Sequence, residues 1–179
     1  AAGLATSGLA FVILLYTFLH HTVFLAIPLM ALCRAMVYFT AVSAFTTEFS
    51  GTLFVFCGAI ALYTAVLTLV GSAENKTRSK YSWAIWATLI SAGVPTILLG
   101  FDSPIAWFTL IVFTAWITFA WSRFLPVIFR PISGMHALIA GFALLDCVLI
   151  ASIDEYTIMI TSGFCFVLTV AAHRKILGT

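Results

Sequence analysis

The residues of this sequence that could do chemistry at a metal centre are its six acidic side chains. Carboxylates hold Mg²⁺ when they converge, which on one helix requires a spacing of three or four residues. No two acidic residues in the chain have that spacing, so we expect no carboxylate-bound metal and no catalytic residue. The six are Glu48, Glu74, Asp102, Asp146, Asp154 and Glu155.

Histidines offer a second kind of chemistry, ligation of a pigment or a haem. A haem held between two helices needs two facing histidines at matched depth. His20 follows the first apolar segment and His136 lies near the start of the sixth, so these two are the candidate ligands. The alternative is that both are hydrated imidazoles at the ends of apolar segments.

Two charged residues lie within long apolar segments, where a charge costs a few kcal/mol and normally faces a partner or a cavity. Arg34 lies about two turns into its segment if a helix begins at Pro28, a favourable first-turn position for proline. It either binds an anionic headgroup or a diphosphate, or extends its guanidinium toward the cytoplasmic interface. Asp146 lies about one turn from the outer end of the sixth segment. It either belongs to a ligand site, or is hydrogen-bonded within the bundle or hydrated near the outer face.

The remaining patterns exclude several classes of protein. The formal net charge of +2, without a basic stripe, argues against a nucleic-acid partner. No zinc-type Cys/His pattern, glycine-rich phosphate loop or nucleophile triad occurs. Four cysteines lie singly in apolar runs, and we interpret them as small buried side chains. They are Cys33, Cys57, Cys147 and Cys165.

The elements that must position these residues are membrane-spanning helices. Apolar residues make up 63% of the 179-residue chain and charged residues only 8%, whereas soluble domains average about 25% charged residues. A bilayer core about 30 Å thick is crossed by about 20 apolar residues in a helix. We predict an all-α bundle of about seven spanning helices in a single transmembrane domain, residues 1–179. The spans are expected near residues 2–19, 27–46, 52–71, 82–100, 105–125, 134–151 and 156–172.

Basic and acidic connectors alternate along the chain, which predicts an orientation. The basic residues gather at residues 72–80, at 123–131 and at the C-terminus, whereas the intervening connectors carry only acidic residues. By the positive-inside rule, the two basic connectors and the C-terminus face the cytoplasm. The first residue then lies on the outer side, and its uncharged surroundings suggest that helices precede it.

Three apolar segments carry short motifs that are shared with a known family. Residues 28–38, PLMALCRAMVY, match an "LMxxCR" helix, and they follow LYTFLHH at residues 15–21. Residues 61–68, ALYTAVLT, with Gly71 and Glu74, match a "YxxxxT…E" segment. Residues 141–146, GFALLD, match a "G…LLDA" helix, with Cys147 in place of the usual alanine. In these motifs the chain resembles the UbiA-type prenyltransferase superfamily, in particular its Ebo-type branch, and the resemblance covers that family's C-terminal two-thirds.

The resemblance implies a UbiA-like fold and candidate ligand-binding residues. Family members carry two Asp-rich motifs in cytoplasmic connectors, and connector 72–80 corresponds to the second of them. There Glu74 is the only acid, while Lys76 and Arg78 either pair with a diphosphate or simply obey the positive-inside rule. The same register implies that three helices, including the first Asp-rich motif, are missing before residue 1, so that the chain has either lost them or is shown without them. The candidate ligand-binding residues are Arg34, Tyr38, Glu74, Lys76, Arg78 and Asp146.

These observations favour a non-catalytic UbiA-like membrane subunit. Its role would be structural, or the binding of an isoprenoid, lipid, quinone or pigment, within a larger assembly such as a photosynthetic or respiratory complex. The expected partners are membrane lipids and other membrane subunits. The alternative is an active prenyltransferase whose N-terminal helices precede this sequence, and only then is Mg²⁺ expected. A transporter is disfavoured because paired intramembrane charges and repeated broken helices are absent from the sequence.

Overall fold

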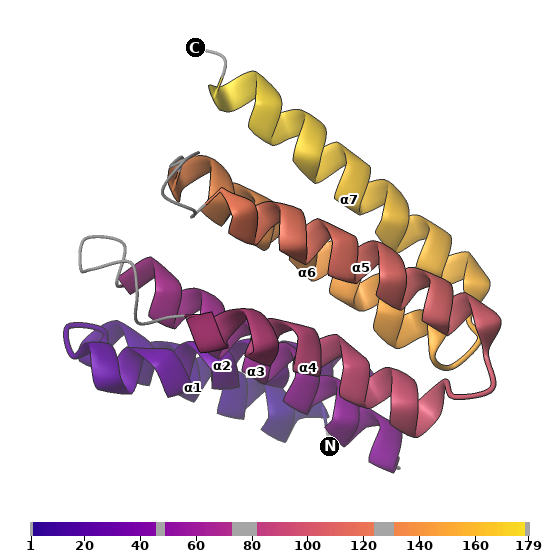
Figure 1. Cartoon of the computed structure of the whole chain (residues 1–179). Helices are drawn as coiled ribbons and strands as arrows, with labels where there is room; N and C mark the ends of the chain where they lie inside the picture. The colour runs from indigo at the N-terminus through magenta and orange to yellow at the C-terminus, as the bar shows by residue number, and fades with distance from the viewer. Residues whose placement is uncertain (1, 46–48, 73–81, 124–130, 178–179) are drawn as a thin grey trace. The chain divides into compact units, whose positions relative to one another are not determined.

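The computed structural model describes residues 2–45, 49–72, 82–123 and 131–177. These residues form seven helices whose ends agree with the predicted segments to within five residues, so the all-helical prediction is confirmed (Figure 1). The helices are α1 (Ala2–Leu19), α2 (Val23–Ser43), α3 (Gly51–Ser72), α4 (Ser82–Leu99), α5 (Pro104–Ser122), α6 (Pro131–Ala151) and α7 (Tyr156–Leu177).

Five of the helices, α2, α3, α5, α6 and α7, are long and apolar enough to cross a membrane. The chain is therefore an integral membrane protein. The apolar parts of α1 and α4 are shorter, Gly3–Leu19 and Trp83–Leu99. At about 1.5 Å per residue they reach about 25 Å, somewhat less than a bilayer core of about 30 Å. Whether α1 and α4 complete a seven-span bundle stays a prediction.

The helices satisfy their own polar groups, as a lipid environment requires. Most of the recorded hydroxyl hydrogen bonds inside them run to backbone carbonyls three or four residues earlier in the same helix, although Ser162 of α7 donates to the Ala143 carbonyl of α6. Thr64 Oγ1, for example, donates to the Ile60 carbonyl at 2.7 Å, and Thr96 Oγ1 to the Ala92 carbonyl at 3.0 Å. Threonines bonded in this way, such as Thr64 and Thr96, mark no polar channel by themselves.

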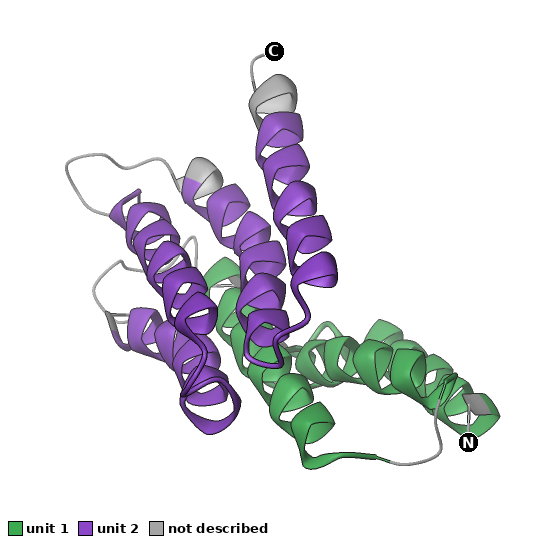
Figure 2. Ribbon diagram, turned by 90° about the vertical axis from the view of Figure 1, so that its right-hand side faces the viewer, with its two compact units in different colours: residues 1–75 green, residues 76–179 purple. Residues whose placement is uncertain are grey.

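The chain divides into two compact units, residues 1–75 and 76–179 (Figure 2). In the first unit α2 packs against both α1 and α3. A Cβ built on Gly8 of α1 would lie 3.2 Å from the Met36 Cε of α2. On the other side of α2, the Cys57 thiol of α3 donates to the Ala35 carbonyl at 3.5 Å. The prediction of one transmembrane domain is not tested by this division.

In the second unit α6 packs against α4, α5 and α7 and is therefore its central helix. Small residues of α6 allow this close packing, because Gly134, Ala140 and Gly141 are all buried. By contrast, α7 lies at the edge of the unit, since no residue of its span Tyr156–His173 is buried. Its exposed residues are largely apolar, among them Ile160, Phe164 and Leu168.

Candidate functional site

The start of α2 differs from the sequence-based prediction, and the difference moves Arg34. The helix begins at Val23, five residues before Pro28. The Thr22 carbonyl accepts the first helical hydrogen bonds, from the amides of Leu25 and Ala26 at 3.0 and 2.9 Å. Pro28 therefore lies inside the helix, where it donates no hydrogen bond to the carbonyl four residues earlier. The placement of Pro28 at the helix start was wrong, because the Thr22 carbonyl starts the helix one turn earlier.

Arg34 consequently lies near the middle of its span. It is the twelfth of the 21 residues of α2, about 16 Å along the axis from the first residue at about 1.5 Å per residue. The side chain is exposed on the surface of the chain. A guanidinium at that depth is about as far from one end of the helix as from the other, so extension to the interface alone does not hydrate it fully.

Arg34 belongs to an exposed stripe on α2, which we define as Arg34, Val37 and Ala41. Their spacing, i, i+3 and i+7, places the three residues on one side of the helix. Tyr38, the second candidate on this helix, follows Arg34 by one turn and is half-buried. The α2 stripe thus places one charged side chain beside two apolar ones on the exposed surface of α2.

The structure describes only some of the other candidate ligand-binding residues. Glu74, Lys76 and Arg78 lie outside the described residues, and the predictions made for them stay predictions. Asp146 lies on α6, five residues before the helix ends at Ala151, which agrees with its expected depth near one end. Its side chain is half-buried. Arg34 and Asp146 belong to different units.

The histidines form two local pairs, one in each unit. His20 lies beside His21 just after α1, with ring centres 4.1 Å apart, and its Nδ1 is 2.7 Å from the Thr17 carbonyl. Both of these rings are exposed. Since His20 and His136 belong to different units, their pairing across a haem stays a prediction.

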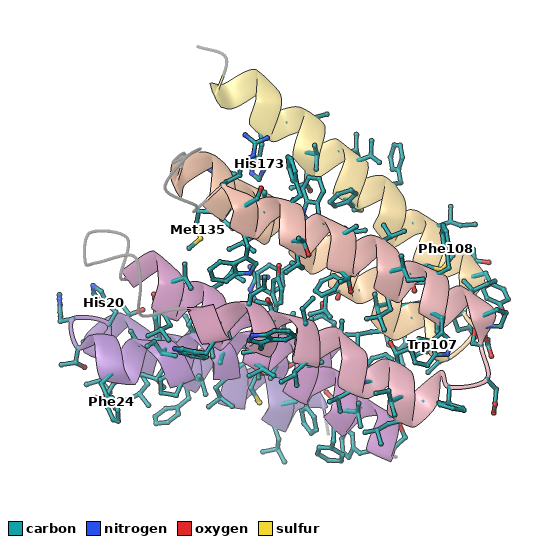
Figure 3. All side chains as sticks on the ribbon, viewed as in Figure 1. His20, Phe24, Trp107, Phe108, Met135 and His173 are labelled. Carbon is teal, nitrogen blue, oxygen red and sulfur yellow. The ribbon has the colours of Figure 1, made fainter. Side chains whose placement is uncertain are left out.

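The second pair joins α6 to α7 and was not predicted from the sequence. The rings of His136 and His173 have centres 4.8 Å apart and planes inclined by 33°. The His136 Nδ1 atom is buried, and within the described part of the chain it has no hydrogen-bond partner. His173 lies on the side of α7 that faces α6 and is half-buried (Figure 3). Because α6 and α7 follow one another and run antiparallel, the two histidines are expected at the same end of the helix pair. That expectation does not predict that their rings lie beside each other.

Trp116 of α5 connects the helices that carry this histidine pair. Its indole N–H donates to the carbonyl of Ala137, the neighbour of His136, at 2.8 Å. Its ring packs edge-on against Phe166 of α7, with centres 4.8 Å apart. Phe166 precedes His173 by seven residues, two turns, so the two lie on the same side of α7. Trp116 therefore holds both helices near the pair.

At the opposite end of the second unit, Asp154 links two loops. It accepts hydrogen bonds on Oδ1 from Ser103 Oγ at 2.8 Å and from the Tyr156 hydroxyl at 3.0 Å. Ser103 is also the N-cap of α5, accepting from the Ala106 amide at 3.4 Å. Asp154 adopts a left-handed backbone conformation, with φ 59°. Its carboxylate is thus engaged in fastening the α4–α5 loop to the α6–α7 turn.

The four cysteines are free thiols, but their expected burial is only partly correct. Cys147 is buried on α6, where its thiol donates to the Met159 carbonyl at 3.5 Å. Cys33 and Cys57 are half-buried, and Cys165 is exposed on α7. The prediction of burial was wrong for Cys165 because an apolar helix at the edge of a membrane bundle turns much of its surface toward lipid.

Comparison with known proteins adds no constraint on function. No family model, curated protein or solved structure matches this chain. Within the described residues, no group of three or more His, Cys, Asp or Glu side chains is placed to hold a metal ion. The features left to interpret are the α2 stripe, the two histidine pairs and the Asp154 loop contact.

Proposed function

We propose that this chain is a non-catalytic, UbiA-like membrane subunit that binds an isoprenoid, lipid or pigment, or another subunit, through the α2 stripe. The observation that carries the proposal is the position of Arg34, exposed and twelfth of 21 residues in a membrane-spanning helix. On insertion scales an arginine at a helix centre costs about 2.5–3.5 kcal/mol. A helix retains such a residue when an anionic or polar group covers it in the membrane.

The acidic residues support the non-catalytic part of the proposal. Ionising an allylic diphosphate needs Mg²⁺ on converging carboxylates, and the sequence has no acids three or four residues apart. Asp154 is further occupied by the two hydroxyl groups that it accepts from. In the proposed orientation, connectors 72–80 and 123–131 and the C-terminus face the cytoplasm.

The experiment compares the wild type with Arg34→Leu after mild extraction from native membranes. Mass spectrometry of the purified material identifies co-purifying proteins and extracted lipids. We expect a partner or an anionic or isoprenoid lipid with the wild type and its loss from Arg34→Leu, which should insert at least as well because a charge is removed. Arg123→Gln is the matched control, since it removes an arginine at the end of α5 that lies over Phe119 at 4.6 Å.

Two outcomes would contradict the proposal. One is that the wild-type chain purifies with neither a protein nor a lipid, or that the same proteins and lipids co-purify with Arg34→Leu as with the wild type. The other is prenyl transfer by this chain alone when Mg²⁺ and an allylic diphosphate are supplied. That second result would favour the prenyltransferase alternative.

A further inference from the structure

We propose that His136 and His173 form a two-histidine site for a late-transition-metal dication of the Cu²⁺ or Zn²⁺ type. The first observation is the unpartnered Nδ1 atom of His136. Buried polar atoms are almost always hydrogen-bonded, and those that are not call for a ligand or water. This nitrogen is buried and has no hydrogen-bond partner among the described residues, and the ring of His173, half-buried on α7, lies beside the His136 ring.

The separation of the rings distinguishes between kinds of metal centre. With a metal–nitrogen bond of about 2.0–2.1 Å, the centre of a bound imidazole lies about 3.2 Å from the metal. Two imidazoles in trans across a haem iron then have centres more than about 6 Å apart, and two in adjacent positions about 4.5–5.2 Å apart. The observed 4.8 Å fits adjacent positions on one ion and is too short for a bis-histidine haem.

Trp116 links the two helices that carry the imidazoles. Trp116 donates to the Ala137 carbonyl beside His136 and packs against Phe166, two turns from His173 on the same side of α7. His173 is the last residue of the α7 span, so the site lies near one end of the membrane region. Water or an anion from the interface can therefore complete the coordination. Imidazole nitrogens suit copper and zinc, and copper binds the more tightly of the two.

The test uses the full chain, purified in detergent with an affinity tag that contains no histidine and stripped with a chelator. Cu²⁺ is titrated by calorimetry, and the bound ion is examined by electron paramagnetic resonance. The wild type should show one site with hyperfine coupling to two imidazole nitrogens. His136→Gln and His173→Gln should each weaken Cu²⁺ binding by at least about tenfold and lose one nitrogen coupling.

The matched control is the His20→Gln, His21→Gln double variant, which removes the other histidine pair and should leave the affinity within about twofold. A second measurement needs no variant. Zn²⁺ should protect His136 and His173 of the wild type from acylation by diethylpyrocarbonate, read by peptide mass spectrometry, while His20 and His21 react as before.

Unchanged Cu²⁺ affinity in both single variants, or the absence of Zn²⁺ protection, would overturn the proposal. The rings would then be a packing contact or a proton-sharing pair. A copper signal that disappears only in the His20→Gln, His21→Gln variant would overturn it as well. The proposal does not depend on the function assigned to the α2 stripe.

Discussion

The close packing around Gly100 predicts that an alanine at this position lowers the free energy of unfolding. Gly100 follows α4 and is buried. A Cβ built there would lie 2.9 Å from the Ala106 Cβ and 2.9 Å from the Ser152 Cα. No described glycine has a positive φ. The backbone conformation therefore permits alanine at position 100, and only the close approach opposes it.

The two atoms in the way cannot move independently of the fold. One is a backbone atom at the end of α6, and the other is a Cβ in the first turn of α5. Gly100→Ala therefore has to separate the α4–α5 loop from α6 by several tenths of an ångström. Overpacking of this kind costs about 1–3 kcal/mol, and we expect that loss in the free energy of unfolding.

Gly163→Ala is the control for inserting a methyl group into the same unit. A Cβ at Gly163, in the interior of α7, would meet only the Cys147 Sγ at 3.8 Å, an ordinary contact. Alanine is favoured over glycine inside a helix by about 0.5–1 kcal/mol. The two substitutions add the same group, yet they should change stability in opposite directions.

The assay is reversible unfolding in mixed micelles with increasing dodecyl sulfate, followed by tryptophan fluorescence. Trp107 reports on the relevant loop, because its indole N–H donates to the Phe101 carbonyl at 2.9 Å. Gly100→Ala should unfold at a lower mole fraction of dodecyl sulfate than the wild type. Gly163→Ala should unfold at the same mole fraction as the wild type or at a higher one. Equal or greater stability of Gly100→Ala would refute the reasoning, because it would mean that the α4–α5 loop and α6 do not meet closely.

Three further predictions concern hydrogen bonds and use the same unfolding assay. Asp154→Gly and Asp154→Ala both lose the two hydroxyl hydrogen bonds, but only alanine keeps the penalty of about 1–2 kcal/mol for a left-handed backbone. Asp154→Ala should therefore be the less stable variant, and equal stabilities of the two would contradict this reasoning. Trp116→Phe should cost about 1 kcal/mol by removing the indole hydrogen bond to the Ala137 carbonyl, and Trp116→Ala about 3 kcal/mol or more. Ser162→Ala, which removes a 2.9 Å hydrogen bond to the Ala143 carbonyl, should cost only about 0.6 kcal/mol; a loss as large as that of Trp116→Ala would show that this contact matters more than polar contacts in membranes usually do.

Most of the fold could be predicted from the sequence because membrane helices are specified locally. An apolar run of about 20 residues must satisfy its backbone hydrogen bonds within itself, whatever surrounds it. The main local error concerns Pro28, because the sequence predicts a helix start at this proline and the helix begins at Val23. That error matters for function because it moves Arg34 from near one end of α2 to its middle.

The sequence by itself determined the elements, which are apolar helices, and the approximate ends of each helix. Only the tertiary structure decided which side chains meet. The contact of His136 with His173, the reach of Trp116 to two neighbouring helices, and the hydrogen bonds of Asp154 depend on how each helix is rotated about its axis. That rotation is decided by side-chain packing between helices, and nearly uniform apolarity leaves no periodic pattern from which to read it.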